Sequence, residues 1–395
     1  MPANNAQTAQ STFKKIFLSD ASHTFTAPGR VNIIGEHTDY NDGFVLPCAI
    51  RFNTVIACRL NGTNKIRMVA ADFDNQMDEF DISHPVPHSE YHWANYLRGV
   101  VSEYQADGYH PMGLDLVITG DIPKGTGLSS SASLEVCFSY ALNELFAFGL
   151  SRKQLAKLSQ RAENHFVGCH CGIMDQLISA CGEKNSALLI DCRDCSTKAV
   201  QIPKSLDLVI INPNVERNLV GSEYNVRRAS CEIAARTMGV DALRDADLAL
   251  LEAHKDTLDE THYRRARHII TENARVKELI DAFNQHNLQA VHDTLAASHA
   301  SMKDDFEITT PELDFVADTL NSWLLNAGGA RMTGGGFGGC AIALIPKEQT
   351  ADICPRLTNQ YSETYGKSMD IYVAEICDGA HTLNTLNMNV DLEYV

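Results

Sequence analysis

Short runs of β-branched and aliphatic residues recur between Thr24 and Thr119, separated by polar or glycine-containing turns. Runs of this length and composition are typical of strands. They lie at residues 44–46, 54–59, 66–70 and 114–118. We therefore expect this part of the chain to be rich in strands. Residues 1–22 are polar, and we expect them to form a loose lead-in with a short helix.

Apolar residues at helical spacing take over further along the chain. Leu134, Phe138, Ala141, Leu142 and Leu145 fall on one face of a helix. The patterns predict other helices at 93–104, 152–166, 172–181 and through most of 223–302. They predict later strands at 187–191, 199–202, 206–211 and 340–345.

The length of the chain, 395 residues, exceeds the roughly 250–300 residues that one hydrophobic core serves. We expect two domains, 1–204 and 205–395, because a polar break near Pro203 separates two strand patterns. No apolar run approaches the roughly 18 residues of a membrane span, and the N-terminus does not resemble a signal peptide. We therefore expect a cytoplasmic protein with no membrane partner, in which the cysteines are free thiols.

The net charge of −17 comes from 33 basic and 50 acidic residues. Such a surface repels a nucleic-acid backbone, so we expect no nucleic-acid partner. It also repels nucleoside triphosphates. A phosphate site would therefore need backbone N–H groups, a few arginines and a metal ion to make it locally positive. The cysteine-containing clusters at 169–171 and 192–195 lack the full ligand pattern of a zinc site.

A glycine- and serine-rich segment, PKGTGLSSSAS at residues 123–133, joins a predicted strand to a predicted helix. Gly125 and Gly127 let the backbone approach a ligand closely. The serines that follow begin a helix, whose unpaired N–H groups attract anions. The segment is neither a Walker A loop nor a dinucleotide fingerprint, because the Gly-Lys-Ser/Thr ending and the third glycine are absent. By itself it is either a phosphate cradle or a flexible, well-capped loop.

A second segment, GRVNIIGEHTDYNDG at 29–43, crowds charged and polar side chains into a turn. Its carboxylates and imidazole suit several hydroxyl groups of a ligand or a metal ion equally well. The acids of a third segment, RAENHFVGCHCGIMDQ at 161–176, suit magnesium binding and proton acceptance, although each could be an ordinary helix acid. A fourth segment, 328–340, has seven glycines in thirteen residues, which indicates tight turning or a purely structural crossing.

Together these segments resemble the galactokinases, within the superfamily of galacto-, homoserine, mevalonate and phosphomevalonate (GHMP) kinases. Residues 29–43 are similar to the galactokinase signature, 123–133 to the phosphate loop of the superfamily and 329–340 to its third motif. VGCHCGIMDQ and GSEYN (221–225) also match, and the resemblance spans about residues 25 to 375. It implies a two-domain α+β fold of the GHMP-kinase type. This fold has a left-handed βαβ unit in the N-terminal domain, a ferredoxin-like C-terminal domain and an active site in the cleft between them.

The resemblance also implies roles for individual residues. Asp175 matches the acid that accepts or orients the proton of the C1 hydroxyl of the sugar, and Arg30 matches the cation that keeps it ionised. The implied sugar contacts are Glu36, His37, Thr38, Asp39, Cys171, Gly172 and Tyr224. The implied ATP contacts are Gly125, Thr126, Gly127, Leu128, Ser129, Ser130 and Ser131 at the phosphates, with Trp93 and Tyr96 at adenine. The implied magnesium ligands are Ser131 and Glu163.

The activity implied by the resemblance is ATP-dependent phosphorylation of galactose at C1, the first phosphorylation of galactose use by the Leloir route. One alternative is a kinase of N-acetylgalactosamine or another small alcohol. A second is a sensor that binds galactose and ATP without catalysis, although such relatives have lost residues that this chain keeps at 129–133. We expect galactose, ATP and Mg²⁺ as the binding partners of a monomer or a weak homo-oligomer.

Overall fold

Three β-sheets organise the protein, whose structure, a computed structural model, describes residues 2–82, 86–215 and 220–383. Within these residues the strand orders are β13-β1-β3-β6-β4-β5, β10-β11-β9-β12 and β2-β7-β8. The strands are β1 (His23–Asn32), β2 (Phe44–Val45), β3 (Pro47–Leu60), β4 (Lys65–Ala70), β5 (Gln76–Asp81), β6 (Leu114–Gly120), β7 (Ala187–Asp191), β8 (Ser196–Val200), β9 (Leu206–Asn212), β10 (Gly329–Thr333), β11 (Cys340–Pro346), β12 (Asp370–Val373) and β13 (His381–Thr382).

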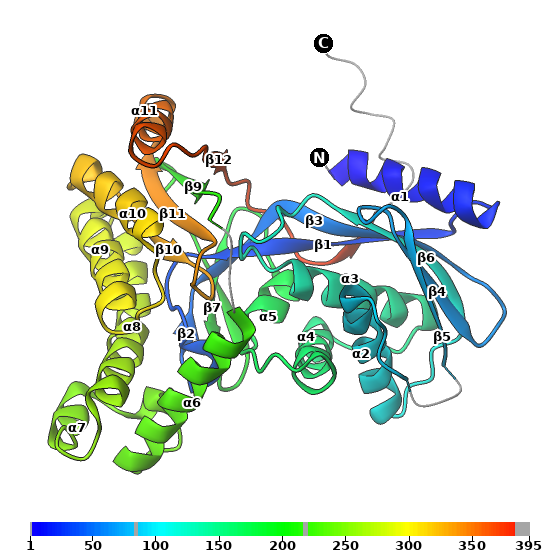
Figure 1. Cartoon of the computed structure of the whole chain (residues 1–395), viewed down its shortest axis with the longest axis horizontal. Helices are drawn as coiled ribbons and strands as arrows, with labels where there is room; N and C mark the ends of the chain where they lie inside the picture. Colours follow the sequence, from blue (N-terminus) through cyan, green and yellow to red (C-terminus); the bar gives the residue numbers. More distant parts are fainter. Residues whose placement is uncertain (1, 83–85, 216–219, 384–395) are drawn as a thin grey trace.

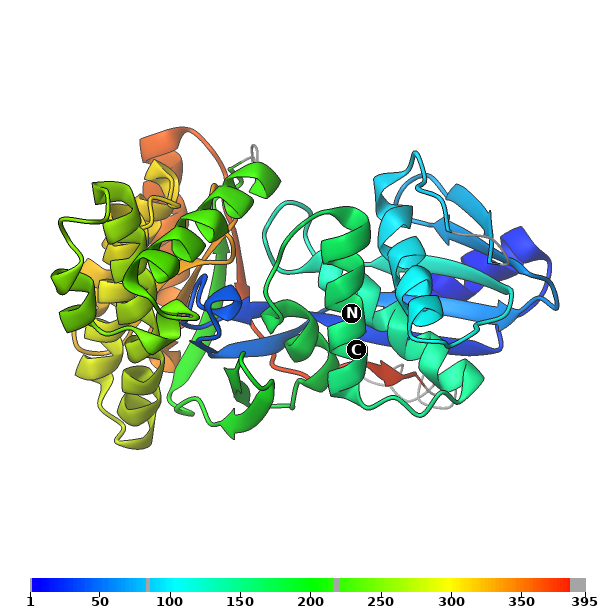
Figure 2. The same ribbon diagram turned by 90° about the horizontal axis from the view of Figure 1, so that it is seen from below.

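Helices cover these sheets and give the molecule two halves that lie side by side (Figures 1 and 2). The helices are α1 (Pro2–Phe17), α2 (His92–Ala106), α3 (Ser130–Phe146), α4 (Arg152–Arg161), α5 (Met174–Cys181), α6 (Val220–Met238), α7 (Leu248–Ala253), α8 (Glu260–Asn284), α9 (Leu288–Asp304), α10 (Pro311–Leu324) and α11 (Lys347–Tyr365). None of those within the described ranges combines the length and the apolar character that a membrane crossing needs.

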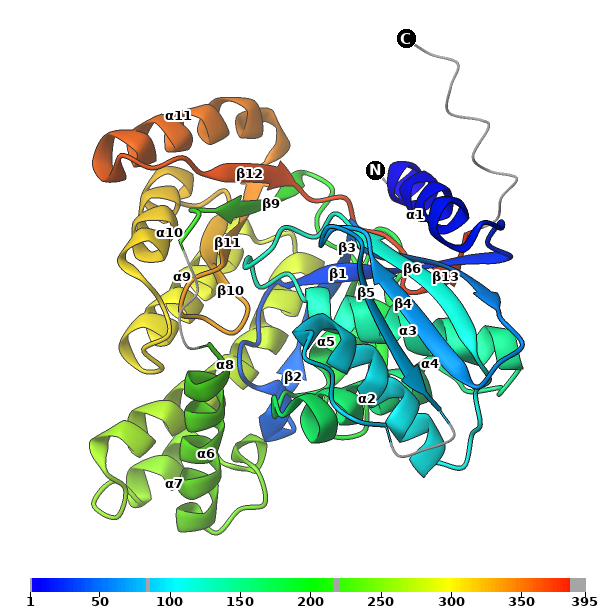
Figure 3. The ribbon, with the colours of Figure 1, turned by 45° about the vertical axis from the view of Figure 1, so that its right-hand side comes forward.

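The six-stranded sheet carries helices on both faces (Figure 3). Helices α2 to α5 bury one face of it in a large apolar cluster. On the other face, α1 packs Ala6, Ala9 and Phe13 against Val55 and Val117. The expectation of a loose N-terminal lead-in is therefore wrong. Apolar residues three and four positions apart recur at the start of the chain and form a buried helix face.

The four-stranded sheet is antiparallel throughout, with the order β12-β9-β11-β10. Numbered along the chain, these strands lie in the order 4-1-3-2, which is the order of a ferredoxin-like βαββαβ unit. The predicted ferredoxin-like C-terminal half is therefore confirmed. In the first sheet, β4 pairs in parallel with β6, and β5 and α2 lie between them in the chain. The left-handed crossover expected there stays a prediction.

A third apolar cluster joins the two halves. It contains Val31 and Ile33 at the end of β1, together with Leu208 and Ile342 from the second sheet and Val276 from α8. The chain also returns to its beginning, because β13 pairs with β1 at the edge of the first sheet. Strand β9 begins at Leu206, directly after the predicted domain boundary at 204/205, and that boundary stays a prediction.

Candidate active site

A cavity of about 260 Å³ opens where the two halves meet, and segments far apart in the sequence line it. The predicted residues that line it are Arg30, Glu36, His37, Asp39, Gly125, Gly127, Leu128, Ser129, Ser130, Ser131, Glu163, Cys171, Gly172, Asp175 and Tyr224. Thr38 and Thr126 are buried outside this lining. The Thr38 hydroxyl donates to the carbonyls of Gly35 and Phe44, and that of Thr126 to the carbonyl of Pro123.

Asp175 lies in the first turn of α5 and is held by Arg30 from the buried strand β1. The Arg30 Nε donates to Asp175 Oδ1 at 2.7 Å and Nη2 donates to Oδ2 at 2.8 Å. Such a two-point contact fixes the plane of the carboxylate as well as its charge. The third guanidinium nitrogen of Arg30 donates to the carbonyl of Gly127 at 2.6 Å, so Arg30 joins the acid to the glycine-rich loop.

Ser129 is the residue that precedes α3, and its hydroxyl points at the acid. Its Oγ donates to Asp175 Oδ2 at 2.5 Å. The backbone of Ser129 has a φ of 63°, the left-handed region that a residue with a side chain rarely adopts. Such a conformation persists only where the surroundings hold it. This serine, predicted as a nucleotide contact, thus also orients the acid.

Glu163 lies in a π-helical turn, residues 162–167, that continues α4 into the cavity wall. Its Oε2 accepts hydrogen bonds from Gln176 Nε2 at 2.6 Å and from Cys171 Sγ at 3.4 Å. Burial, and then the charge of Asp175, raise the pKa of Glu163 to about 7. Ser131 also hydrogen-bonds this carboxylate. The two predicted metal ligands therefore meet at one point on the cavity wall.

Asp39 faces Asp175 from the turn of the second predicted segment. Burial, and then the charge of Asp175, raise the pKa of Asp39 to about 7. Gly172 packs directly on the carboxyl group of Asp39, and a Cβ at this position would overlap the Asp39 carboxylate. Only glycine therefore fits at 172 while Asp39 keeps this position.

His37 lies beside the aromatic rings of Tyr40 and Tyr224, with ring centroids 5.6 and 5.0 Å away. Burial lowers the pKa of His37 to about 3, so the imidazole is neutral. Its Nε2 lies 3.3 Å from the carbonyl of Gly335, which only accepts, so Nε2 carries the proton. Nδ1 then accepts from the Tyr40 hydroxyl at 2.7 Å.

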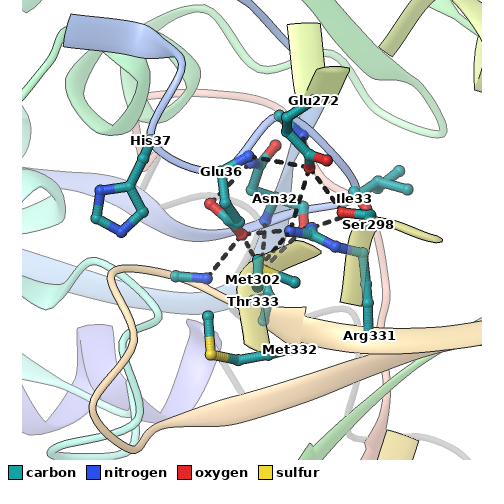
Figure 4. Close-up of polar contacts among 12 residues, drawn as sticks. Asn32, Ile33, Glu36, His37, Glu272, Ser298, Met302, Arg331, Met332 and Thr333 are labelled. Carbon is teal, nitrogen blue, oxygen red and sulfur yellow. Dashed lines mark hydrogen bonds and ion pairs between the residues drawn. The ribbon is translucent and has the colours of Figure 1, made fainter. Parts of the chain in front are cut away.

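Glu36 is almost fully buried, and the third predicted motif of the superfamily surrounds its carboxylate (Figure 4). The backbone N–H of Gly334 and the hydroxyl of Thr333 donate to Oε1 at 2.8 and 3.1 Å. Asn32 Nδ2 donates to Oε2 at 3.0 Å. The glycine-dense segment is therefore part of the site, beyond any role as a structural crossing.

A second cavity, of about 580 Å³, adjoins the first. Ser130 and Ser131 line both cavities, and Trp93 and Tyr96 line the second together with Phe73. Its walls are mainly apolar and aromatic, whereas charged groups crowd the first cavity. The two cavities thus differ in the chemistry that they can bind, and the serine loop lies between them.

Several residues of the site were missed by the sequence analysis. Asn32 and Thr333 hold Glu36, and Gln176 bridges Glu163 to the buried carboxyl group of Glu135. Asn32 and Gln176 stand inside the quoted segments, so their amide side chains were a signal that could have found them. Glu135 is the exception, because it lies on α3 among apolar residues.

Three regions of the chain match known protein families. Residues 11–60 match the galactokinase galactose-binding signature. Residues 95–183 match the N-terminal domain of the GHMP kinases, and residues 279–362 match their C-terminal domain. The matched regions contain Glu36 and Asp175, and the C-terminal match contains the glycine-dense segment.

Solved structures support the same assignment. The structure of Lactococcus lactis galactokinase complexed with galactose is 37% identical, with a TM-score of 0.90, over 95% of this chain and 98% of that chain. Methanococcus jannaschii mevalonate kinase is 18% identical, with a TM-score of 0.61, over 90% of this chain and 99% of that chain. Streptococcus pneumoniae phosphomevalonate kinase, in complex with phosphomevalonate and AMPPNP, is 15% identical, with a TM-score of 0.62, over 91% of this chain and 99% of that chain. The two mevalonate-pathway enzymes share the fold alone, whereas the galactokinase match covers nearly the whole chain at substantial identity. The chain belongs to the galactokinase family of the GHMP kinases.

Proposed function

We propose that this sugar kinase transfers the γ-phosphoryl group of ATP to the C1 hydroxyl of α-D-galactose, giving α-D-galactose 1-phosphate and ADP. One observation carries the proposal. Asp175, oriented by Arg30 and Ser129, stands between a group of sugar-type contacts and a glycine-rich anion loop in a single cavity. An acid in this position faces both reactants.

The sugar occupies the side of the cavity formed by Glu36, His37, Asp39 and Tyr224. Carboxylates accept hydrogen bonds from hydroxyl groups, and a site built for such bonds discriminates strongly against sugars that cannot make them. The galactose bound to the Lactococcus lactis enzyme supports this choice of substrate.

The triphosphate occupies the loop at residues 125–131, and adenine occupies the aromatic cavity beside Trp93 and Tyr96. The first turn of α3 offers N–H groups that have no acceptor within the helix. Arg30 is the sole lysine or arginine among the described residues that line the main cavity. A protein of net charge −17 therefore relies on backbone groups, Arg30 and a bound cation to hold ATP there.

The residues present fit Mg²⁺, which Ser131 and Glu163 would hold. Within the described ranges, no three His, Cys, Asp or Glu side chains are arranged to hold a metal. Mg²⁺ needs fewer protein ligands than that, because it keeps several waters and binds substrate phosphates. When bound, Mg²⁺ would neutralise phosphate charge.

The reaction follows from these positions. The C1 oxygen bonds to the γ-phosphorus, and the bond from that phosphorus to the β–γ bridging oxygen breaks, leaving ADP. Asp175 orients the hydroxyl and accepts its proton as the new bond forms. Arg30 holds the Asp175 carboxylate in place and stabilises negative charge on the transferred group.

A coupled assay of ADP release tests the proposal across galactose, N-acetylgalactosamine and other hexoses. Galactose is expected to be turned over fastest. Asp175→Asn is expected to lower kcat by about 10²–10⁴-fold, because the amide cannot accept the proton. Asp293→Asn, an exposed change on α9, serves as the matched control and should keep the parent rate.

Two results would contradict the proposal. Faster turnover of N-acetylgalactosamine than of galactose would overturn the substrate, and an Asp175→Asn protein with the parent rate would overturn the role of the acid. We further propose a cytoplasmic location and a monomer or weak homo-oligomer, which fractionation and gel filtration test.

A further inference from the structure

Two buried residues from the C-terminal half, Glu272 of α8 and Arg331 of β10, stand directly behind the loop that carries Glu36 (Figure 4). Both side chains are 0% exposed, and Arg331 Nη2 lies 3.6 Å from Glu272 Oε1. Burying two charges costs free energy unless each finds partners of good geometry. Their partners therefore indicate what these charges hold, and several of them belong to residues 33–36, called the Glu36 loop below.

Glu272 holds the backbone of that loop. Its Oε1 accepts the N–H of Gly35 at 3.0 Å and that of Glu36 at 3.4 Å. The same oxygen accepts the hydroxyl of Ser298 at 2.7 Å, while Arg275 donates to Oε2 at 2.9 Å. A carboxylate that gathers successive backbone amides fixes the course of the turn, here at a glycine with a φ of 102°.

Arg331 holds the side chain of Glu36 and the strand before it. Its Nη1 lies 3.4 Å from Glu36 Oε1 and also donates to the carbonyl of Asn32 at 3.3 Å. The Gly334 N–H donates to Glu36 Oε1 at 2.8 Å, and the Thr333 hydroxyl, which also lies 2.8 Å from the Asn32 carbonyl, is 3.1 Å from this Oε1. Among the described residues Oε2 has one donor, Asn32, so it keeps accepting capacity for a ligand in the cavity that Glu36 lines.

The charges of the cluster balance. Glu36 and Glu272 contribute two negative charges, and Arg275 and Arg331 contribute two positive charges. Burial alone would raise the pKa of Glu272, but Arg331 and then Arg275 outweigh it and lower that pKa to about 2. Because His268 is neutral, with a pKa lowered to about 4 by burial, it donates Nε2–H to the Glu36 carbonyl without adding charge.

We propose that Glu272 and Arg331 are positioning residues for galactose: they hold the Glu36 loop so that one carboxylate oxygen faces the sugar. The inference rests on the proposed role of Glu36 as a sugar contact. Because the loop belongs to the N-terminal half and its two supports to the C-terminal half, the sugar site is complete only when the halves are docked. Because the loop is already held in position, it loses no further conformational entropy when the sugar binds.

The test measures galactose and ATP separately in the full-length enzyme. Glu272→Gln is expected to raise the KM and the Kd for galactose about tenfold, the loss of one hydrogen bond to a charged group. The KM for ATP and the kcat at saturating galactose should stay within about twofold, because Glu272 bonds the turn at Gly35 and Glu36, while other residues form the phosphate loop.

Asp115→Asn is the matched control. Asp115 has a 0% exposed side chain and pairs with Arg67 in the first sheet, so this change also neutralises a buried carboxylate but touches neither cavity. It should lower Tm as Glu272→Gln does and leave the Kd for galactose unchanged. An equal rise in the galactose Kd in both variants would reduce the effect to general destabilisation and overturn the inference.

Glu36→Gln separates this inference from the proposed function. If Glu36→Gln leaves galactose binding intact, the sugar role of Glu36 itself fails. If Glu36→Gln weakens binding and Glu272→Gln does not, only the positioning role fails. Should Glu272→Gln not fold, Arg331→Lys and the milder Ser298→Ala take its place. Both should raise the galactose Kd while leaving the ATP KM unchanged, and a parent-like galactose Kd in both would overturn the inference.

Discussion

Four described carboxylates line one cavity, and their immediate partners separate what each can do. Asp175 has a two-point contact with Arg30, which fixes the plane of its carboxylate. Glu36 is held by donors from two motifs. Asp39 and Glu163 are the exceptions, because burial and a neighbouring charge raise the pKa of both to about 7. When they are charged and no ligand is bound, these two buried carboxylates therefore lower the stability of the folded protein.

Asp39 gives a prediction in which stability and binding move in opposite directions. In the unfolded chain it ionises near pH 4, and in the folded protein near pH 7. Its burial therefore costs stability that grows above about pH 4 and is complete above about pH 7. Asp39→Asn should raise Tm at about pH 8, and this gain should fade as the pH falls toward 4.

The same variant should bind galactose at least about tenfold more weakly, since a charged acceptor is lost. For the parent protein, galactose affinity should fall as the pH drops through about 7 and Asp39 becomes protonated. Thermal unfolding and calorimetric titration measure the two effects, with Asp293→Asn as the exposed control. A lower Tm at pH 8 for Asp39→Asn would contradict burial and the charge of Asp175 as the causes of the raised pKa.

At the scale of elements, the reactive groups stand on the ends and irregular turns of helices. Asp175 is in the first turn of α5, Ser129 precedes α3 in a left-handed conformation, and Glu163 is on a π-helical turn. π-Helical turns frequently mark functional sites. The helix that begins after the glycine-rich segment could be predicted from its apolar face, whereas the π-turn could not, because its residues continue an ordinary helical pattern.

Helix α1 supplies the prediction at this scale. Phe13 is fully buried against the face of the first sheet opposite the helices that present Asp175 and Ser129. Phe13→Ala should therefore cost about 3–5 kcal/mol of stability while leaving the KM values for galactose and ATP unchanged. Denaturant unfolding and steady-state kinetics measure this, with the exposed Lys15→Ala as control. A change in either KM would mean that α1 acts on the site.

At the scale of the molecule, the cluster shared between the halves predicts cooperative unfolding. Val31 and Ile33 from β1 pack with Leu208 and Ile342 from the second sheet. Calorimetry should therefore record one unfolding transition, and galactose at a hundred times its Kd should stabilise the whole protein by about 2.7 kcal/mol. Two transitions, of which only one moves with galactose, would contradict this coupling.

The sequence could predict most of the site because its residues stand in compact motifs. The turn with Glu36 and Asp39, the serine loop and the segment that contains Asp175 were all visible as local concentrations of polar groups. The support that Glu272 gives to this turn was not visible. Glu272 lies 237 positions from Gly35, inside a long helix where a glutamate usually faces solvent. Tertiary packing alone reveals that it is buried.

The return of the chain to its beginning has a consequence for synthesis. Residues that follow every strand of the second sheet complete the first one: Cys377 donates to the carbonyl of Ala49, and β13 pairs with β1. Domains generally fold in order as they leave the ribosome. Here the N-terminal half cannot close its sheet edge in that order. The edge of β1 stays unpaired until β13, the last described strand, has emerged. Truncated chains that end before β13 would therefore present this open edge to one another.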